Sequence, residues 1–138
     1  MKSSIFFKVA SGLLAFFGMA HTFGMFTEDE GEIKAVVSMM RSVHFDAMGT
    51  SRTVFDFYFG FGLLLTLFLL FSSVLSWQLG NLSKEQPAIA RRIAWPFAVA
   101  ILVVAVLCWM YFFIAPQVIA SLAAVCLIAG AITIKNDV

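Results

Sequence analysis

The stretch "TVFDFYFGFGLLLTLFLLFSSVLSW", residues 53–77, decides the fold. Asp56 is its only acidic or basic side chain, and an unbroken, largely apolar run follows it. A helix that crosses the hydrocarbon of a bilayer needs about 20 mostly apolar residues, and this stretch supplies them. Three other segments have the same character, so the sequence predicts membrane spans over residues 5–26, 54–77, 93–113 and 118–134.

The composition of the whole chain agrees with this interpretation. Of 138 residues, 62% are hydrophobic and 12% are charged, whereas soluble domains are about half apolar and a quarter charged. The last two spans are joined by the short connection "IAPQ", in which Pro116 ends one helix and suits the first turn of the next. We therefore expect residues 1–138 to form a single all-α domain, an integral membrane antiparallel four-helix bundle.

The distribution of basic residues predicts the orientation. Residues 1–8, 78–92 and 135–138 carry six Lys or Arg residues, whereas residues 27–53 carry three, together with five acidic residues. Loops rich in Lys and Arg stay in the cytoplasm. The sequence thus predicts a multi-pass protein of the bacterial inner membrane with both termini and the loop 78–92 in the cytoplasm, and with the loop 27–53 outside.

The first span has a second interpretation. Lys2, the apolar run and the small residues of "FGMA" before His21 are also compatible with a secretory signal peptide cleaved near residue 20. Against cleavage, the segment stays apolar through "HTFGMF", as a full-length membrane helix would. The sequence leaves both possibilities open.

The outer loop contains a predicted amphipathic helix. From residue 32 onward, apolar residues recur at helical spacing: Ile33, Val36, Val37, Met40, Val43 and Ala47. Gly49 is expected to end this helix, and Thr50, Ser51 or Thr53 to cap the next. The helix either lies on the membrane surface and bundle mouth or covers a site between the spans.

Small residues within the spans predict close helix packing, which membrane helices use because lipid offers no hydrophobic drive for association. We assign this packing role to Gly18, Gly60, Gly62 and Gly130. Lys8 is interpreted as an interfacial anchor and Pro96 as a residue in the first turn of its helix. Cys108 and Cys126 are interpreted as buried small hydrophobes, because an expected offset in depth of roughly 6 Å makes a disulfide awkward.

Four polar residues are candidates for a pocket at the outer face: His21, Arg52, Asp56 and Tyr58. Ionisable groups inside a membrane are costly, so they normally pair or face a water-filled cavity. Asp56 is equally suited to a structural role at a helix N-terminus, paired with Arg52. With His44, the pair His21 and Asp56 offers metal-ligating chemistry, and two histidines offer haem ligation. The sequence identifies no cofactor.

The run "FDAMGTSRTVFDFYFGFGLLLTLFLLFSSVLSWQLG" and the histidine of "GMAHTFG" resemble a group of small bacterial inner-membrane proteins with four helices and no assigned activity. The shared positions are His21, Gly49, Arg52, Asp56, Tyr58, Gly60 and Gly62. The resemblance implies fold and location only, because architecture alone supplies no function.

Two functions are compatible with the sequence. The first is a non-enzymatic bundle or accessory subunit that binds lipid, another membrane protein or a second copy of itself. The second is a small-molecule, metal or redox-cofactor site that faces outward between the first two spans. Scattered Lys and Arg residues without a basic patch argue against nucleic acid as a partner.

Overall fold

Helices make up most of the residues that the structure describes. The computed structural model describes residues 2–27 and 30–134. The elements run in the order α1 (Lys2–Phe26), α2 (Gly31–Ser42), β1 (His44–Ala47), β2 (Thr50–Thr53), α3 (Val54–Glu85), α4 (Pro87–Tyr111) and α5 (Ile114–Thr133). The helices α1, α3, α4 and α5 are long and apolar enough to cross a membrane. The prediction of a helical chain with four long apolar helices is therefore confirmed, whereas the small sheet was not predicted.

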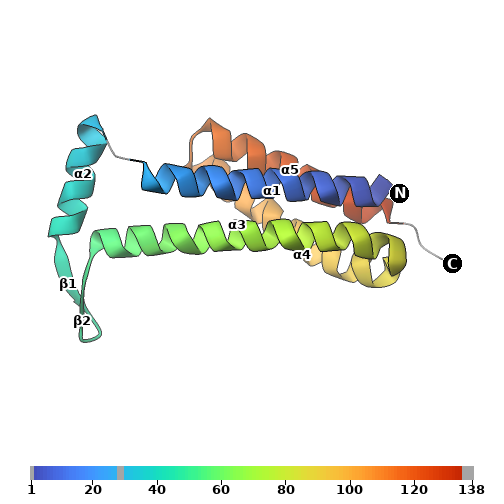
Figure 1. The fold of residues 1–138 in the computed structure, drawn as a ribbon, viewed down its shortest axis with the longest axis horizontal. Helices are drawn as coiled ribbons and strands as arrows, with labels where there is room; N and C mark the ends of the chain where they lie inside the picture. The colour runs from blue at the N-terminus through green and yellow to red at the C-terminus, as the bar shows by residue number, and fades with distance from the viewer. Residues whose placement is uncertain (1, 28–29, 135–138) are drawn as a thin grey trace.

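The four long helices lie lengthwise beside one another (Figure 1). α1 packs against α3 and α5, and α4 packs against α5 and, over a smaller contact, against α3. The N-terminus and the α3–α4 connection lie at one end, which we call the terminal end (Figure 1). At the opposite end, the loop end, α2 lies across the ends of α1 and α3, and the β-hairpin continues from it (Figure 1).

Serine side chains line the contact between α1 and α3, which we call the serine seam. Ser3 Oγ donates to Ser83 Oγ (3.4 Å), Ser73 Oγ donates to the Ser11 carbonyl (2.9 Å), and Ser76 Oγ donates to the Phe7 carbonyl (2.7 Å). The order of these pairs shows that α1 and α3 run in opposite directions. Small side chains let the two backbones approach closely enough for such bonds.

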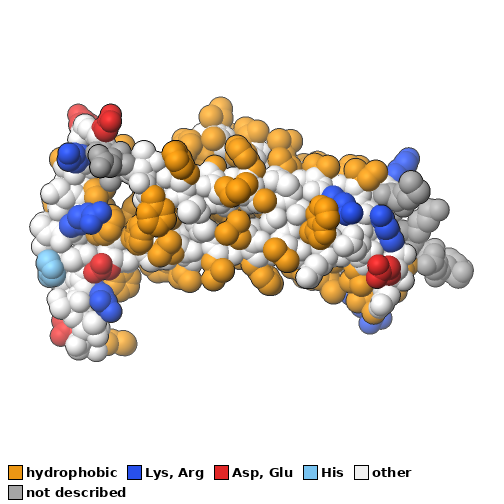
Figure 2. All heavy atoms as spheres, in the orientation of Figure 1, with side chains coloured by type: hydrophobic (Ala, Val, Ile, Leu, Met, Phe, Trp, Pro, Cys, Tyr) orange, Lys and Arg blue, Asp and Glu red, His pale blue; other side chains and the backbone are white. Residues whose placement is uncertain are grey.

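The surface of the four long helices is apolar around its middle. Large hydrophobic side chains point outward there, including Leu67 (65% exposed), Phe71 (61%) and Val125 (63%). Charged side chains gather toward the two ends instead (Figure 2). The buried positions hold many Ala and Ser residues. A surface more hydrophobic than the interior suits hydrocarbon rather than water as the surrounding medium.

Two predictions at the terminal end are wrong. Residues 78–92 were expected to form a loop, but α3 continues to Glu85, α4 begins at Pro87, and Gln86 alone lies between the helices. Pro96 therefore lies inside α4, and Pro87 occupies the first turn. The apolar length needed to cross hydrocarbon sets only a minimum for a helix. Packing of Leu79, Gly80 and Ser83, all buried, extends α3 beyond that minimum.

The loop between α1 and α3 also differs from its prediction. α2 ends at Ser42, and residues 44–53 form an antiparallel hairpin in which His44 pairs with Thr53 and Ala47 with Thr50. Met48 and Gly49 make the turn, and both have positive φ (55° and 83°). Two-residue hairpin loops favour positive φ at these positions, because the backbone of such a turn then has the same twist as the two strands. Val43 and Ala47 thus lie outside the helix expected to contain them.

The serine seam yields a matched pair of substitutions. Ser76 is fully buried and donates to α1, whereas Ser72 is 1% exposed and its Oγ has no hydrogen-bond partner among the described residues. We expect Ser76→Ala to lower the free energy of unfolding by about 1 kcal/mol, the scale of interhelical hydrogen bonds in membrane proteins. Ser72→Ala should be neutral or stabilising, because it removes a buried unpaired hydroxyl.

Reversible unfolding in mixed detergent–SDS micelles measures both variants. Equal destabilisation by the two substitutions would contradict the hydrogen-bonding role given to Ser76.

Candidate functional site

Asp56 caps the start of α3. Its carboxylate accepts a hydrogen bond from the Thr53 backbone N–H (2.8 Å), and the Thr53 hydroxyl accepts one from the Asp56 backbone N–H (3.1 Å). This reciprocal arrangement is a capping box, which satisfies two N–H groups that a helix start otherwise leaves unpaired. Thr53 ends β2 in an extended conformation, which places the Thr53 hydroxyl beside the first turn of α3.

His21 forms a separate polar contact between α1 and α3. Its Nδ1 lies 3.0 Å from the Thr66 hydroxyl, and the Thr22 hydroxyl donates to the same Thr66 oxygen (3.2 Å) and to the Gly18 carbonyl (2.7 Å). His21 and Thr66 are both half-buried. The contact joins the two helices within the stretches that are otherwise apolar, so we call it the histidine bridge.

The structure does not bring the four candidate pocket residues together. Asp56 lies ten residues before Thr66 on α3, a rise of about 15 Å, so His21 is far below the capping box. His44 in β1 pairs with Thr53 near Asp56, but its Nδ1 contacts the Ser42 carbonyl (3.0 Å). Among residues 2–27 and 30–134, no group of three or more His, Cys, Asp or Glu residues is placed to hold a metal ion.

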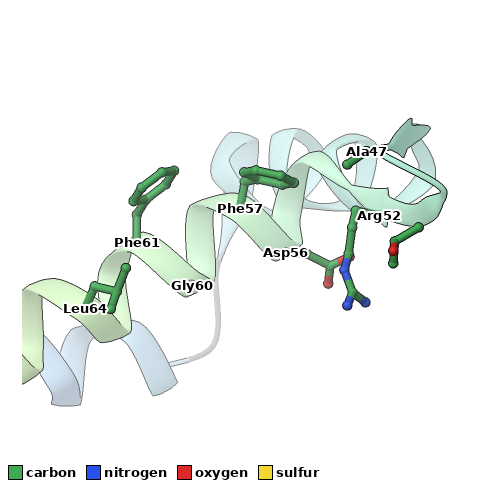
Figure 3. Close-up of a pocket in the computed structure, with 8 residues that line it drawn as sticks. Ala47, Arg52, Asp56, Phe57, Gly60, Phe61 and Leu64 are labelled. Carbon is green, nitrogen blue, oxygen red and sulfur yellow. The ribbon is translucent and has the colours of Figure 1, made fainter.

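Arg52 and Asp56 share an open hollow beside the hairpin. The hollow has a volume of about 400 Å³ and is lined by Ala47, Thr50, Arg52, Asp56, Phe57, Gly60, Phe61 and Leu64. The Arg52 and Asp56 side chains extend to the same side of α3, whereas Phe57 and Phe61 form the apolar wall (Figure 3). The Thr53 N–H holds the Asp56 carboxylate. Asp56 is therefore a structural cap of α3, with the Arg52 guanidinium nearby.

Tyr58 lines a second and larger space, the α2 groove, which lies between α2 and the loop-end turns of α1 and α3. Its volume is about 710 Å³, and its lining residues are Gly24, Met25, Phe26, Thr27, Lys34, Val37, Ser38, Arg41, Phe55, Tyr58 and Phe59. The aromatic rings form a continuous wall: Phe26 meets Phe59 edge to face (5.6 Å between centroids), and Phe59 stacks on Phe55 (5.7 Å). The Arg41 guanidinium lies 3.7 Å from the Phe55 ring centre.

The cationic side of the α2 groove was not predicted from the sequence. Lys34 and Arg41 are seven residues apart, or about two helical turns, and so share one face of α2. That spacing is visible in the sequence. The spacing does not show that this face of α2 turns toward the aromatic start of α3, because the hairpin sets the direction of α2.

The four glycines assigned to packing have different surroundings. A Cβ at Gly18 would lie 3.0 Å from Leu70, one at Gly62 would lie 2.5 Å from Met25, and one at Gly130 would lie 2.9 Å from the Phe7 ring. A Cβ at Gly60 would have no neighbouring atom within 4 Å, so Gly60 faces the open hollow beside the hairpin. Packing within the fold therefore does not explain why residue 60 is a glycine.

The remaining polar candidates lie toward the terminal end or on the α4–α5 pair. Lys8 Nζ lies 4.5 Å from the centre of the Trp77 ring, a cation–π contact that suits an anchor near a membrane surface. Cys108 and Cys126 are both free thiols. The Trp77 ring accounts for the placement of Lys8, whereas Cys108 is buried and Cys126 half-buried.

Comparison with known proteins gives no match: no family model, no curated protein and no solved structure is similar to this chain. The resemblance to small bacterial inner-membrane proteins therefore stays a prediction, and the site has to be interpreted from its own geometry.

The capping box makes Asp56 testable as a structural residue. Thr53→Ala should lower the free energy of unfolding by about 1 kcal/mol, as is typical for loss of an N-cap hydroxyl. Asp56→Ala should also destabilise the start of α3, and the double variant should be less destabilised than the sum, since the two side chains act as one unit. Amide hydrogen exchange at residues 53–57 reports the effect directly, because the Thr53 and Asp56 N–H groups are the two that the box satisfies.

Ser51→Ala is the matched control, because Ser51 is exposed in β2, just before the cap. If Asp56→Ala leaves amide exchange at the start of α3 unchanged, capping is not its role.

Proposed function

We propose that this chain is an integral membrane protein whose four long helices form an antiparallel bundle, and that it binds lipid or another membrane protein without catalysing a reaction. In this proposal it lies in a bacterial inner membrane, with the terminal end in the cytoplasm and α2 and the hairpin outside. The observation that carries the proposal is the broad belt of exposed Leu, Phe and Val side chains between two charged ends. Such a belt is stable only against lipid or apolar protein surface.

The two ionisable residues best suited to chemistry support a non-catalytic role. His21 contacts Thr66, and Asp56 is held by Thr53, so both have contacts that account for them structurally. A metal or redox site between α1 and α3, the alternative function, would have to displace the histidine bridge. The bilayer interpretation also accounts for that bridge, because polar groups in hydrocarbon seek partners on a neighbouring helix.

α1 is part of the functional protein in this proposal. Phe7 and Leu14 are buried at 0% and 1% exposure in the core shared with the other helices. Cleavage near residue 20 would remove the serine seam and uncover the facing sides of α3 and α5. Retention of α1 as a membrane helix therefore fits the packing better than removal as a signal peptide.

Native mass spectrometry of the protein purified in mild detergent tests the proposal. We expect a full-length chain of 15.2 kDa that carries lipid or a partner protein and no metal. His21→Ala should lower the folded yield without removing any bound cofactor. A stoichiometric metal ion or chromophore that is lost in a well-folded His21→Ala variant would contradict the proposal and favour the redox or metal site.

A further inference from the structure

The α2 groove combines cations with an aromatic wall at the loop end. Lys34 and Arg41 are its only charged lining residues among those that the structure describes, and both are basic. Phe26, Phe55, Tyr58 and Phe59 supply the opposite wall. A groove with two positive charges and apolar rings has the chemistry to hold a ligand with a negative head and an apolar body.

The groove lies where the apolar surface of the helices ends. α3 has 32 residues and is about 48 Å long, whereas the hydrocarbon of a bilayer is about 30 Å thick. The first turns of α3 therefore project beyond the hydrocarbon if its middle spans it. α2 lies across this projecting part (Figure 1), which in such a placement is level with the lipid headgroups.

The groove is also continuous with lipid-facing surface. Phe26 and Tyr58 are 66% and 61% exposed although they line it, and Phe23, one turn earlier in α1 and nearer the middle of the helices, is 77% exposed. Acyl chains of a bound lipid would follow these side chains toward the apolar belt. A soluble anion has no part that would use this surface.

Arg41 is held ready to bind an acceptor. Its guanidinium stacks on Phe55, which occupies the face of the group and leaves its N–H edges for hydrogen bonds. Arg is favoured for phosphate recognition because those edges donate in a fixed fork. Basic residues beside a membrane helix recognise anionic headgroups by the same charge attraction.

We propose that the α2 groove binds an anionic phospholipid, with Lys34 and Arg41 on the headgroup phosphate and the aromatic wall against the start of the acyl chains. This inference rests on the proposed function, since only a membrane-embedded chain presents the groove to headgroups. It goes further by assigning a particular lipid class to a particular site.

The test uses the full-length protein in nanodiscs of mixed phosphatidylcholine and phosphatidylglycerol. Native mass spectrometry then measures which lipid stays bound after release from the nanodisc. We expect preferential retention of phosphatidylglycerol, reduced about fivefold for each cation removed in Lys34→Gln and Arg41→Gln. Arg41→Lys should keep most of the preference, because it keeps the charge.

The matched control is the pair Lys84→Gln and Arg92→Gln, which removes the same charge from exposed residues at the terminal end. This pair should leave retention at the wild-type level. Lys34→Gln alone decides the outcome if substitution of the stacked Arg41 impairs folding, because Lys34 is exposed.

Three outcomes overturn the inference. Equal loss of phosphatidylglycerol in the groove and control variants would mean that general charge attraction, not the groove, selects the lipid. Displacement of the lipid by inorganic phosphate would identify a soluble anion as the ligand. Extraction of the wild-type chain from membranes by alkaline carbonate would instead refute the proposed function, and this inference with it.

Discussion

The pairing of polar groups between α1 and α3 is the constraint on which the rest of the structure depends. The serine hydroxyls between these helices are buried, so neither water nor lipid reaches them and an unpaired hydroxyl there is costly. The serine seam satisfies its polar groups across the interface, and the histidine bridge does the same nearer the loop end. These bonds fix the register of the two helices. That register places the first turn of α3 beyond the end of α1, where α2 and the hairpin begin.

At the loop end the polar groups are satisfied locally instead. Asp56 and Thr53 cap each other, and Asp46 accepts a hydrogen bond from the Gly49 N–H at the hairpin turn (2.6 Å). Local bonds of this kind leave the basic residues of α2 free to face a groove rather than to hold the fold together. We infer that the apolar helices stabilise the protein in the bilayer, whereas the loop end binds the anionic phospholipid.

Sequence patterns predicted the long helices well because apolar length is a property of each segment alone. They also identified Thr53 among the capping residues and Pro116 as a first-turn residue of α5. The prediction that "IAPQ" joins the last two helices and that Pro116 ends the first of them is wrong, because α4 ends at Tyr111 and α5 begins at Ile114. Two kinds of feature escaped prediction. Helix length beyond the hydrocarbon depends on packing partners, as with Leu79 and Gly80, and the Met48–Gly49 turn lacks the usual Asn-Gly signal. The pairing of His21 with Thr66 rather than Asp56 depends on helix register, which no single segment encodes.

Chemical labelling of single cysteines along α3 tests the membrane placement most directly, in a Cys108→Ala, Cys126→Ala background. Val54, Leu67, Val74 and Asn81 are all exposed in the fold, so only surrounding lipid can protect them. We expect an impermeant maleimide to label Val54→Cys from outside intact cells and Asn81→Cys only after the cells are opened, with Leu67→Cys and Val74→Cys unlabelled in both. Labelling of Leu67→Cys or Val74→Cys in intact membranes would contradict a bilayer-spanning α3.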